Sequence, residues 1–387
     1  SLWPSLMEKK GFLTSMITPI IKATKSSSVK SFYTLTDYEN WKKENNNGKG
    51  WKIKYYKGLG TSTSSEAKEY FQNLKMQNFY WNEKSKNSLD LAFNKERSDD
   101  RKEWLANYNS QNILDSNEEV VYFNDFIDKE FIHFSNYDLE RSIPNIMDGM
   151  KTSLRKVLFS CFKRKLTSEI RVAQLAGYVS ENAAYHHGEA SLQGAIIGMA
   201  QDYIASNNIN FLAPIGQFGT RLQGGKDSAS PRYIHTCLEK IVYSLFPEKD
   251  QPVLDYLDDD GLLVEPTYYS PILPTILING SKGIGTGYSS DIPMYNPLDL
   301  LKNIKNLIHN KPLEEISPWY YGFEGEIHKI NKHQYISKGK FNIVNYKTLE
   351  ITELPIGTWT EDYKDFLETL LIDYEKKSKK KDGSRSN

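Results

Sequence analysis

The sequence has few of the features that mark secreted, zinc-binding or membrane proteins. It contains two cysteines, Cys161 and Cys237, which are too few for a disulfide framework and lack the paired spacing of a zinc site. Its longest apolar run, Ile272–Ile278, is far too short to span a bilayer, and no signal-peptide pattern opens the chain. We therefore expect a soluble protein of a reducing, intracellular compartment with no membrane partner.

The chain also has no net charge, since 49 basic residues balance 49 acidic ones. The overall balance therefore does not indicate a nucleic-acid partner. The local balance differs, because the segment from Lys151 to Arg171 contains seven basic residues and one acid, Glu169. A run of charge is most often a solvated surface, so binding to an anionic partner stays one of two alternatives here.

Changes in composition divide the 387 residues into two or three domains. Short β-rich and helical runs mix up to residue 80, and a linker is expected over residues 81–119. The pattern is strongly helical over 120–262, and proline-punctuated and β-rich over 263–374. A basic tail over 375–387 is expected to be disordered. The chain begins without an initiator methionine, so we expect a piece of a longer protein.

A glycine-containing turn joins a predicted strand to a predicted helix early in the chain. Lys57, Gly58 and Gly60 form this turn, and Ser64 and Ser65 are candidate caps of the helix. Such a turn can hold a phosphate at the helix N-terminus, although the motif KGLG alone is more often a plain tight turn.

Consecutive short amphipathic helices are predicted in the region that follows the linker, with basic residues at their starts. This arrangement suits a helix-turn-helix or winged-helix unit, in which one helix enters the major groove of DNA. Two of the helices are separated by Tyr185, His186 and His187. Adjacent histidines do not share a helix face, which argues against a metal site. Hydrogen bonding or proton transfer at a helix start, with Ser191 in the first turn, is the better functional interpretation.

The segment Ile215–Ile234 combines glycines with three basic residues, Arg221, Lys226 and Arg232. Glycine permits unusual dihedral angles and close approach, so this backbone is expected to come close to something anionic. Arg232 and Tyr233 would then carry the chemistry. The alternative is that Tyr233 packs half-buried, as most tyrosines do.

A helix is predicted from about Ile234 to Leu245, followed later by three consecutive carboxylates, Asp258–Asp260. The carboxylates precede a glycine and lie between a helical and an extended pattern, so a turn is favoured over a divalent-metal site. The glycine cluster Gly280–Gly287 does not lead straight into a helix, and this argues against a dinucleotide-binding fingerprint.

Six ordered motifs closely resemble the breakage-reunion core of eukaryotic-type DNA topoisomerase II. They are RSIPNIMDGMKTSLRKVLFSCFKR, RVAQLAG, AYHHGE, SNNIN, PIGQFGTRLQGGKDSASPRY and LINGSKGIGTGY. Upstream, WPSL, ITPIIKAT, KGWKIKYYKGLGTSTS and DDRKEW are similar to the last part of the same family's Toprim domain and the segment after it. The resemblance covers nearly the whole chain.

The resemblance implies an α+β multidomain fold. Residues 1–80 would be the C-terminal part of a Toprim α/β domain, and 81–119 a linker. Residues 120–262 would form a winged-helix domain with the catalytic tyrosine, and 263–374 part of a β-rich tower domain. One departure is that the family usually has Lys-Pro-Gly-Gln where this chain has Lys151, Thr152, Ser153 and Leu154.

The resemblance also implies roles for single residues. Tyr233 would attack a DNA phosphodiester and become joined to the 5′ end of the broken strand. Arg232 would stabilise the charge of the transition state, and His187 would hydrogen-bond the scissile phosphate or handle protons. Ile284 would be an apolar wedge that enters a base step. Further DNA contacts would come from Lys57, Arg101, Lys102, Arg141, Lys151, Lys156, Tyr185, His186 and Ser191.

The implied partners are double-stranded DNA and a second copy in a two-fold dimer, in which each protomer cuts one strand. Mg²⁺ would be held by ligands upstream of Ser1, and ATP by a domain that this chain lacks. The full enzyme would relax supercoils by strand passage in the nucleus, whereas the chain alone is expected to be inactive. Two alternatives stay open at this point: a non-catalytic module that binds and bends DNA, and a structural interaction protein whose glycine loops are only tight turns.

Overall fold

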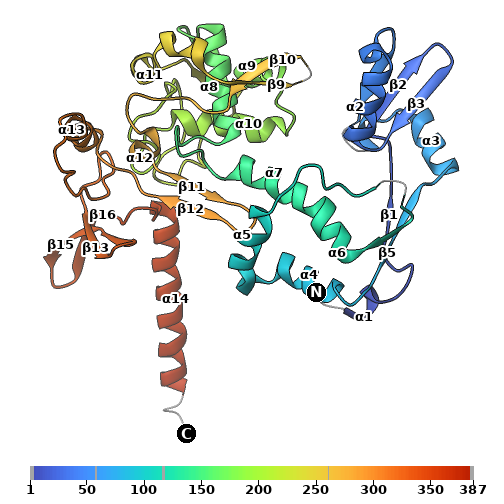
Figure 1. Cartoon of the computed structure of the whole chain (residues 1–387). Helices are drawn as coiled ribbons and strands as arrows, with labels where there is room; N and C mark the ends of the chain where they lie inside the picture. Colours follow the sequence, from blue (N-terminus) through green and yellow to red (C-terminus); the bar gives the residue numbers. More distant parts are fainter. Residues whose placement is uncertain (1–3, 57–58, 116–117, 260, 384–387) are drawn as a thin grey trace. The chain divides into compact units, whose positions relative to one another are not determined.

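The computed structural model describes residues 4–56, 59–115, 118–259 and 261–383 (Figure 1). The chain forms two compact units. Unit 1 comprises Ser1–Asp138 with Thr286–Tyr288, and unit 2 comprises Leu139–Gly285 with Ser289–Asn387. The predicted boundary between residues 119 and 120 therefore falls inside unit 1.

The first sheet of unit 1 has three antiparallel strands in the order β3-β2-β4. Apolar residues from it and from the following helix make a core of Ile21, Ala23, Phe32, Tyr38 and Trp41. The elements are α1 (Pro4–Met7), β2 (Ile21–Lys25), β3 (Ser28–Phe32), α2 (Leu35–Glu44), the 3₁₀ turn Asn46–Gly48 and β4 (Lys52–Tyr55).

Helix α3 (Ser64–Gln72) follows the turn that was a candidate phosphate site. Its cap is Thr63, which forms a capping box with Glu66, so the predicted caps Ser64 and Ser65 are wrong by one and two residues. Glu66 also accepts hydrogen bonds from Lys54 and Tyr56. Burial alone would raise the pKa of Glu66, but these hydrogen bonds lower it to about 2.

The second sheet of unit 1 has the order β1-β5-β6, with β5 and β6 parallel. Residues 81–119, expected as a linker, contain two helices, and Arg101 of the second donates to the carbonyls of Leu91 and Asn94 and so ties the two together. The elements are β1 (Thr14–Met16), β5 (Met76–Tyr80), α4 (Ser85–Phe93), α5 (Ser98–Ala106), β6 (Val120–Tyr122), α6 (Phe123–Phe126), the π-helical turn Ile127–Phe131 and α7 (Ile132–Ser142), with 3₁₀ turns at Leu59–Thr61 and Lys95–Arg97.

Unit 2 is built around three helices, α8 (Thr152–Arg164), α9 (Val172–Asn182) and α10 (Glu189–Ala200). Their apolar faces share one core, which includes Leu158, Leu175 and Ile196. The predicted helix at 234–245 is shorter, α11 (Lys240–Leu245), because β8 (His235–Thr236) pairs with β7 (Ile170–Arg171) instead. The remaining elements are the 3₁₀ segment Glu248–Val253, β9 (Tyr256–Asp259), β10 (Leu262–Pro266) and α12 (Thr275–Ile278).

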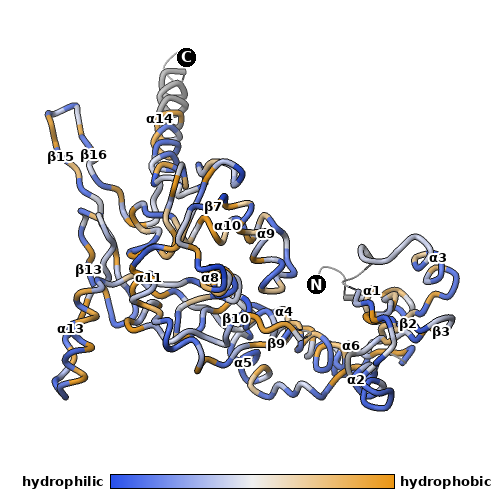
Figure 2. The backbone as a smooth tube through the Cα atoms, turned by 90° about the horizontal axis from the view of Figure 1, so that it is seen from above, coloured by the Kyte–Doolittle hydropathy of each residue, from blue (hydrophilic) through white to orange (hydrophobic). Residues whose placement is uncertain are grey.

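The C-terminal third of unit 2 consists of hairpins and two helices. Along α13 (Pro297–Ile308), hydrophobic and hydrophilic residues alternate (Figure 2). Helix α14 (Thr360–Gly383) continues through most of the predicted disordered tail, and its lysines and glutamates are good helix formers. Residues 384–387 lie outside the described residues. The hairpins are β11 (Ser281–Ile284) with β12 (Ser289–Ile292), β13 (Glu326–Asn331) with β14 (Gln334–Lys338), and β15 (Lys340–Asn345) with β16 (Thr348–Glu353).

Across the described ranges, no helix combines the length and the apolar character that a membrane span requires.

Candidate functional site

The backbone of Tyr233 is held by hydrogen bonds, and its side chain is exposed. Its amide donates to the Ser230 carbonyl over 2.9 Å. On either side, the first amides of α9 donate to the loop, Ala173 to Pro231 over 3.0 Å and Val172 to Ile234 over 3.1 Å. The side chain is 76% exposed, and its hydroxyl makes no hydrogen bond to another described residue. The loop therefore presents an accessible phenol on a backbone that is held in place. This contradicts the alternative in which Tyr233 packs half-buried.

The glycines of the Tyr233 loop are required by the way the loop folds on itself. Gly219 has a φ of 99°, and a Cβ there would lie 2.6 Å from the Cα of Gly225. A Cβ at Gly225 would lie 2.4 Å from the side-chain nitrogen Nε2 of Gln201. Asp227 closes the turn by accepting the Thr220 amide over 2.8 Å, and hydrogen bonds from Thr220 lower the pKa of Asp227. Internal packing is thus sufficient to explain these glycines.

The three basic residues of this segment have different environments. Arg221 forms an ion pair with the buried Glu353 and donates to the Leu354 carbonyl over 2.6 Å. It is therefore not free for an anion. Arg232 and Lys226 are exposed and make no ion pair to another residue that the structure describes. Arg232, which directly precedes Tyr233 in the chain, is consequently a cation that is available to an anion.

His187 lies on the loop between α9 and α10, with its side chain exposed. Its ring stands edge-on to that of Tyr185, with 5.4 Å between the ring centroids. Tyr185 is only 8% exposed and belongs to the core of unit 2. Burial therefore speaks against Tyr185 as a direct DNA contact and gives it the role of a support beneath His187.

Two more predicted DNA contacts are bound to other protein groups. The Lys156 ammonium donates to Glu265 over 2.7 Å and to the Ala183 carbonyl over 2.6 Å. His186 Nε2 lies 3.0 Å from a carboxylate oxygen of Asp259. A phosphate would have to displace these partners, so the geometry speaks against direct DNA contact by Lys156 and His186. The sequence offered no signal for either pairing, because the partners lie 109 and 73 residues away.

Three other predicted contacts have available side chains. Arg141 is exposed in the last turn of α7, and Ser191 is exposed in the first turn of α10. Lys151 is half-buried at the N-cap of α8 and makes no capping bond. Within the described ranges, none of these three side chains has a hydrogen bond or ion pair. Next to Lys151, Thr152 Oγ1 donates to the Glu140 carbonyl over 3.2 Å.

Ile284 ends strand β11 with its side chain 75% exposed. The glycines on either side of it were expected to permit contact with DNA. A Cβ at Gly283 would lie 2.3 Å from the Ser142 carbonyl oxygen, and one at Gly285 would lie 2.7 Å from a methyl carbon of Leu139. The hairpin is thus packed tightly on the end of α7, and this packing is sufficient to require both glycines. The isoleucine stays uncovered.

The remaining predicted contacts belong to unit 1. Arg101 is occupied by the carbonyls of Leu91 and Asn94, as described above. Lys102 pairs with Asp99 over 2.6 Å in an exposed contact. Lys57 lies outside the described residues.

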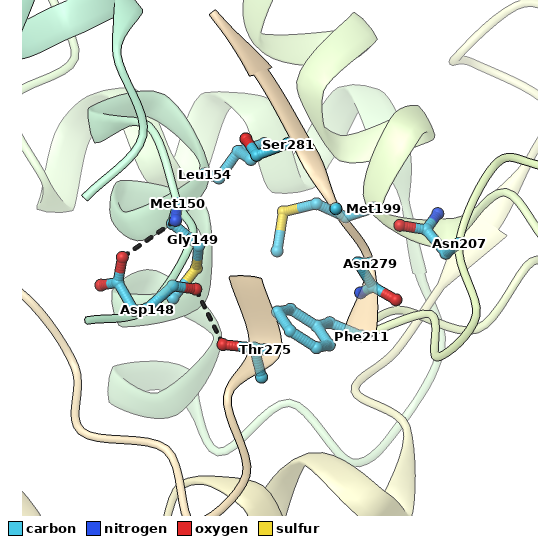
Figure 3. Close-up of a pocket in the computed structure, with 11 residues that line it drawn as sticks. Asp148, Gly149, Met150, Leu154, Met199, Asn207, Phe211, Thr275, Asn279 and Ser281 are labelled. Atoms are coloured by element: carbon cyan, nitrogen blue, oxygen red, sulfur yellow. Dashed lines mark hydrogen bonds between the residues drawn. The ribbon is translucent and has the colours of Figure 1, made fainter. Parts of the chain in front are cut away.

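A small cavity of about 100 Å³ lies beside the start of α8 and contains one charged lining residue, Asp148 (Figure 3). Asp148 is buried and pairs with Arg155 Nε over 2.8 Å. Its carboxylate also accepts the amides of Met150 and Tyr269, each over 2.9 Å, and its carbonyl accepts the Thr275 hydroxyl over 2.8 Å. All of these groups are paired within the protein, so Asp148 is a structural charge of the core.

The described residues do not fit a magnesium site. Among them, no group of three or more His, Cys, Asp or Glu side chains lies close enough to hold a metal ion. Asp258 and Asp259 are on strand β9, and Asp258 accepts the Gly261 amide over 2.8 Å at the hairpin turn. The predicted turn therefore begins after Asp259, because Asp258 and Asp259 themselves belong to the strand, and Asp260 lies outside the described residues.

Two family models match the chain. Residues 141–385 match the model of the DNA gyrase/topoisomerase IV A subunit, and residues 16–139 match the C-terminal associated domain of TOPRIM. Both matches agree with the resemblance found in the sequence motifs.

Individual relatives are similar over nearly all of this chain. DNA topoisomerase 2 of Plasmodium falciparum is 53% identical over 375 residues, which are 96% of this chain and 27% of that protein. Human DNA topoisomerase 2-alpha is 48% identical over 390 residues, 97% of this chain and 25% of the relative. The chain thus spans about a quarter of the length of the curated relatives it matches.

A solved structure is also similar. It is the crystal structure of the Plasmodium falciparum topoisomerase II DNA-binding, cleavage and re-ligation domain, which aligns with a TM-score of 0.78 at 53% identity. The alignment covers 96% of this chain and 51% of that one. The chain therefore belongs to the type II DNA topoisomerase family.

Proposed function

We propose that this chain forms the DNA-cleaving part of a type II topoisomerase, with Tyr233 as the nucleophile. The observation that carries the proposal is the Tyr233 side chain, which is 76% exposed on a loop whose backbone is held on both sides. A nucleophile that must reach a phosphate in a large duplex needs both an accessible side chain and a backbone that is held in place. The similarity to the Plasmodium falciparum topoisomerase II DNA-binding, cleavage and re-ligation domain supports it.

The reaction is a transesterification. The Tyr233 oxygen bonds to phosphorus, and the bond from phosphorus to the 3′ oxygen breaks, leaving a 5′-phosphotyrosine and a 3′ hydroxyl that receives the proton. A phenol holds its proton at neutral pH, so a nearby cation or base must assist its loss. Arg232 is the available cation for the charge that develops on the phosphate, and exposed His187 donates to the phosphate or carries the proton. Because the ester keeps the bond energy, the reverse attack reseals the strand.

DNA contacts are assigned to the side chains that are available to phosphates. Arg141, Lys151 and Ser191 line the path of the backbone, and Ile284 enters a base step and bends the duplex. Lys57 and Lys102 are proposed as further contacts, with Arg101 as the support of the helix that carries Lys102.

The domain names and the larger assembly are part of the same proposal. Residues 120–262 correspond to a winged-helix domain and 263–374 to a tower domain, and two copies act as a two-fold dimer so that both strands are cut. In the full protein, magnesium would be held by ligands other than the described residues, and ATP would supply the energy for strand passage. The setting is the nucleus, where supercoils are relaxed.

The test is covalent trapping. Full-length protein, denatured during turnover on labelled duplex DNA, should carry DNA on Tyr233, and a Tyr233→Phe enzyme should carry none. Tyr346→Phe, which changes another exposed tyrosine, should form the wild-type amount. Adduct formation by Tyr233→Phe would disprove the assignment.

A further inference from the structure

Two carboxylates of the β9–β10 hairpin are connected to the loop that carries His187, one directly and one through Lys156. Glu265 on β10 has a side chain that is 1% exposed and pairs with Lys156, whose ammonium also donates to Ala183 at the start of this loop. Asp259 on β9 lies 3.0 Å from His186, the neighbour of His187. The hairpin is thus connected to the loop by two paths. The buried path runs from Glu265 through Lys156 to Ala183, and the partly exposed path runs from Asp259 to His186.

The loop needs such support because its own backbone is not regular. Ala183 ends α9, and Ala184 has a φ of 46° in the left-handed region, which alanine rarely adopts. Such a conformation persists only where surrounding contacts hold it. The Lys156 ammonium supplies one of them at the Ala183 carbonyl, immediately before the strained residue.

The two contacts hold the chain before and after Tyr185, the buried residue that attaches this loop to the core. Lys156 holds the loop before Tyr185, the buried ring that stands edge-on to His187. Asp259 holds His186, directly before His187 in the chain. Tyr185 contacts the His187 ring, and the two carboxylates that hold the chain around Tyr185 belong to one hairpin. The direction of the His187 ring therefore depends on the position of that hairpin.

We propose that the β9–β10 hairpin positions His187 for cleavage, with Asp259 and Glu265 as positioning residues that act through His186 and Lys156. This inference rests on the proposed function. It differs from the sequence-based expectation, in which His186 and Lys156 contact DNA themselves.

The first experiment measures the rate of covalent adduct formation and the DNA affinity of the full-length protein. Asp259→Asn removes the charged partner of His186 at a partly exposed site, so folding should be retained. We expect adduct formation to slow about two- to fivefold, the range for a partly exposed pair, with unchanged DNA affinity. Asp259→Glu, which keeps a carboxylate, should recover part of the rate. The matched control is Asp258→Asn, the same charge change one residue earlier, which should behave as wild type.

A double-mutant comparison tests whether the effect passes through His187. In a His187→Ala background, Asp259→Asn should cause no further loss, because the residue that it positions is absent. An equal loss with and without His187, or a loss of DNA affinity in place of rate, would overturn the proposal.

The buried path is tested by the combined change Lys156→Met and Glu265→Met. Replacing both charges with apolar groups usually preserves folding, while the Ala183 carbonyl loses its donor. We expect adduct formation to fall about tenfold, as for a small displacement of a catalytic group, at unchanged DNA affinity. A wild-type rate in this variant would show that the hairpin does not position the loop. If wild-type protein forms no adduct on Tyr233, the proposed function itself has failed, so the two failures are distinguishable.

Discussion

The two loops that carry the candidate catalytic residues are held in different ways. The Tyr233 loop is fixed mainly by main-chain hydrogen bonds and by glycines that pack against each other, with one ion pair between Arg221 and Glu353. The side chains of Tyr233 and Arg232 have no hydrogen-bond or ion-pair partner among the residues that the structure describes. The His187 loop is fixed by side chains, through charged contacts with a separate hairpin. A loop that presents a nucleophile to a phosphate gains from a rigid backbone. A loop that orients one ring can instead set the direction of that ring through side-chain contacts.

This comparison predicts that loss of a single charge should harm the His187 loop most. Glu265→Ala leaves the mostly buried Lys156 ammonium without its partner, so we expect about 3–5 kcal/mol loss in the free energy of unfolding. Denaturant unfolding of the protein measures it. Glu314→Ala, which removes an exposed partner of Lys302, should cost at most about 1 kcal/mol. Equal effects at the two sites would contradict the assigned burial of the Lys156 pair.

The Tyr233 loop should instead be sensitive to one added carbon atom. Gly219→Ala places a Cβ 2.6 Å from the backbone of Gly225 at a φ of 99°, so we expect a loss of about 1–3 kcal/mol together with loss of the DNA adduct. Gly194→Ala in helix α10, where a Cβ meets nothing within 4 Å, should stabilise the protein slightly. A tolerated Gly219→Ala would mean that the loop is not held by its backbone.

Acid should weaken the Tyr233 loop through Asp227. Hydrogen bonds from Thr220 lower the pKa of Asp227, so the carboxylate stabilises the fold above its unfolded value of about 3.9, and this stabilisation is lost as the pH falls through the lower folded value. Unfolding measured from pH 6 to pH 2 should therefore show a smaller decrease for Asp227→Asn than for wild type. Identical profiles would show that Asp227 does not close this turn.

The smallest expected effect is at a side chain that neither loop uses. Lys151→Ala should change the free energy of unfolding by less than about 0.5 kcal/mol. If Lys151 contacts a phosphate, the slope of log affinity against log salt should decrease by about 0.9. Lys249→Ala, at an exposed lysine outside the proposed DNA path, should leave that slope unchanged.

Much of the fold in unit 2 could be predicted from local sequence. Amphipathic spacing indicated the helices now seen as α8, α9 and α10, and the motif between the last two placed His187 in a loop. Predictions were poorer where pairing with distant strands decides the structure. His235 and Thr236 pair with β7 instead of belonging to the predicted helix.

The sequence by itself determined which residues could carry chemistry, because the order of motifs around Tyr233, Arg232 and His187 is a property of the chain. Only the tertiary structure decided which of the basic residues are free. Lys156 and Arg221 resemble phosphate ligands in the sequence, yet their charges are paired with Glu265 and Glu353 from far along the chain. The physical reason is that a partly buried cation needs an opposite charge beside it, and folding, not sequence distance, brings that charge into contact.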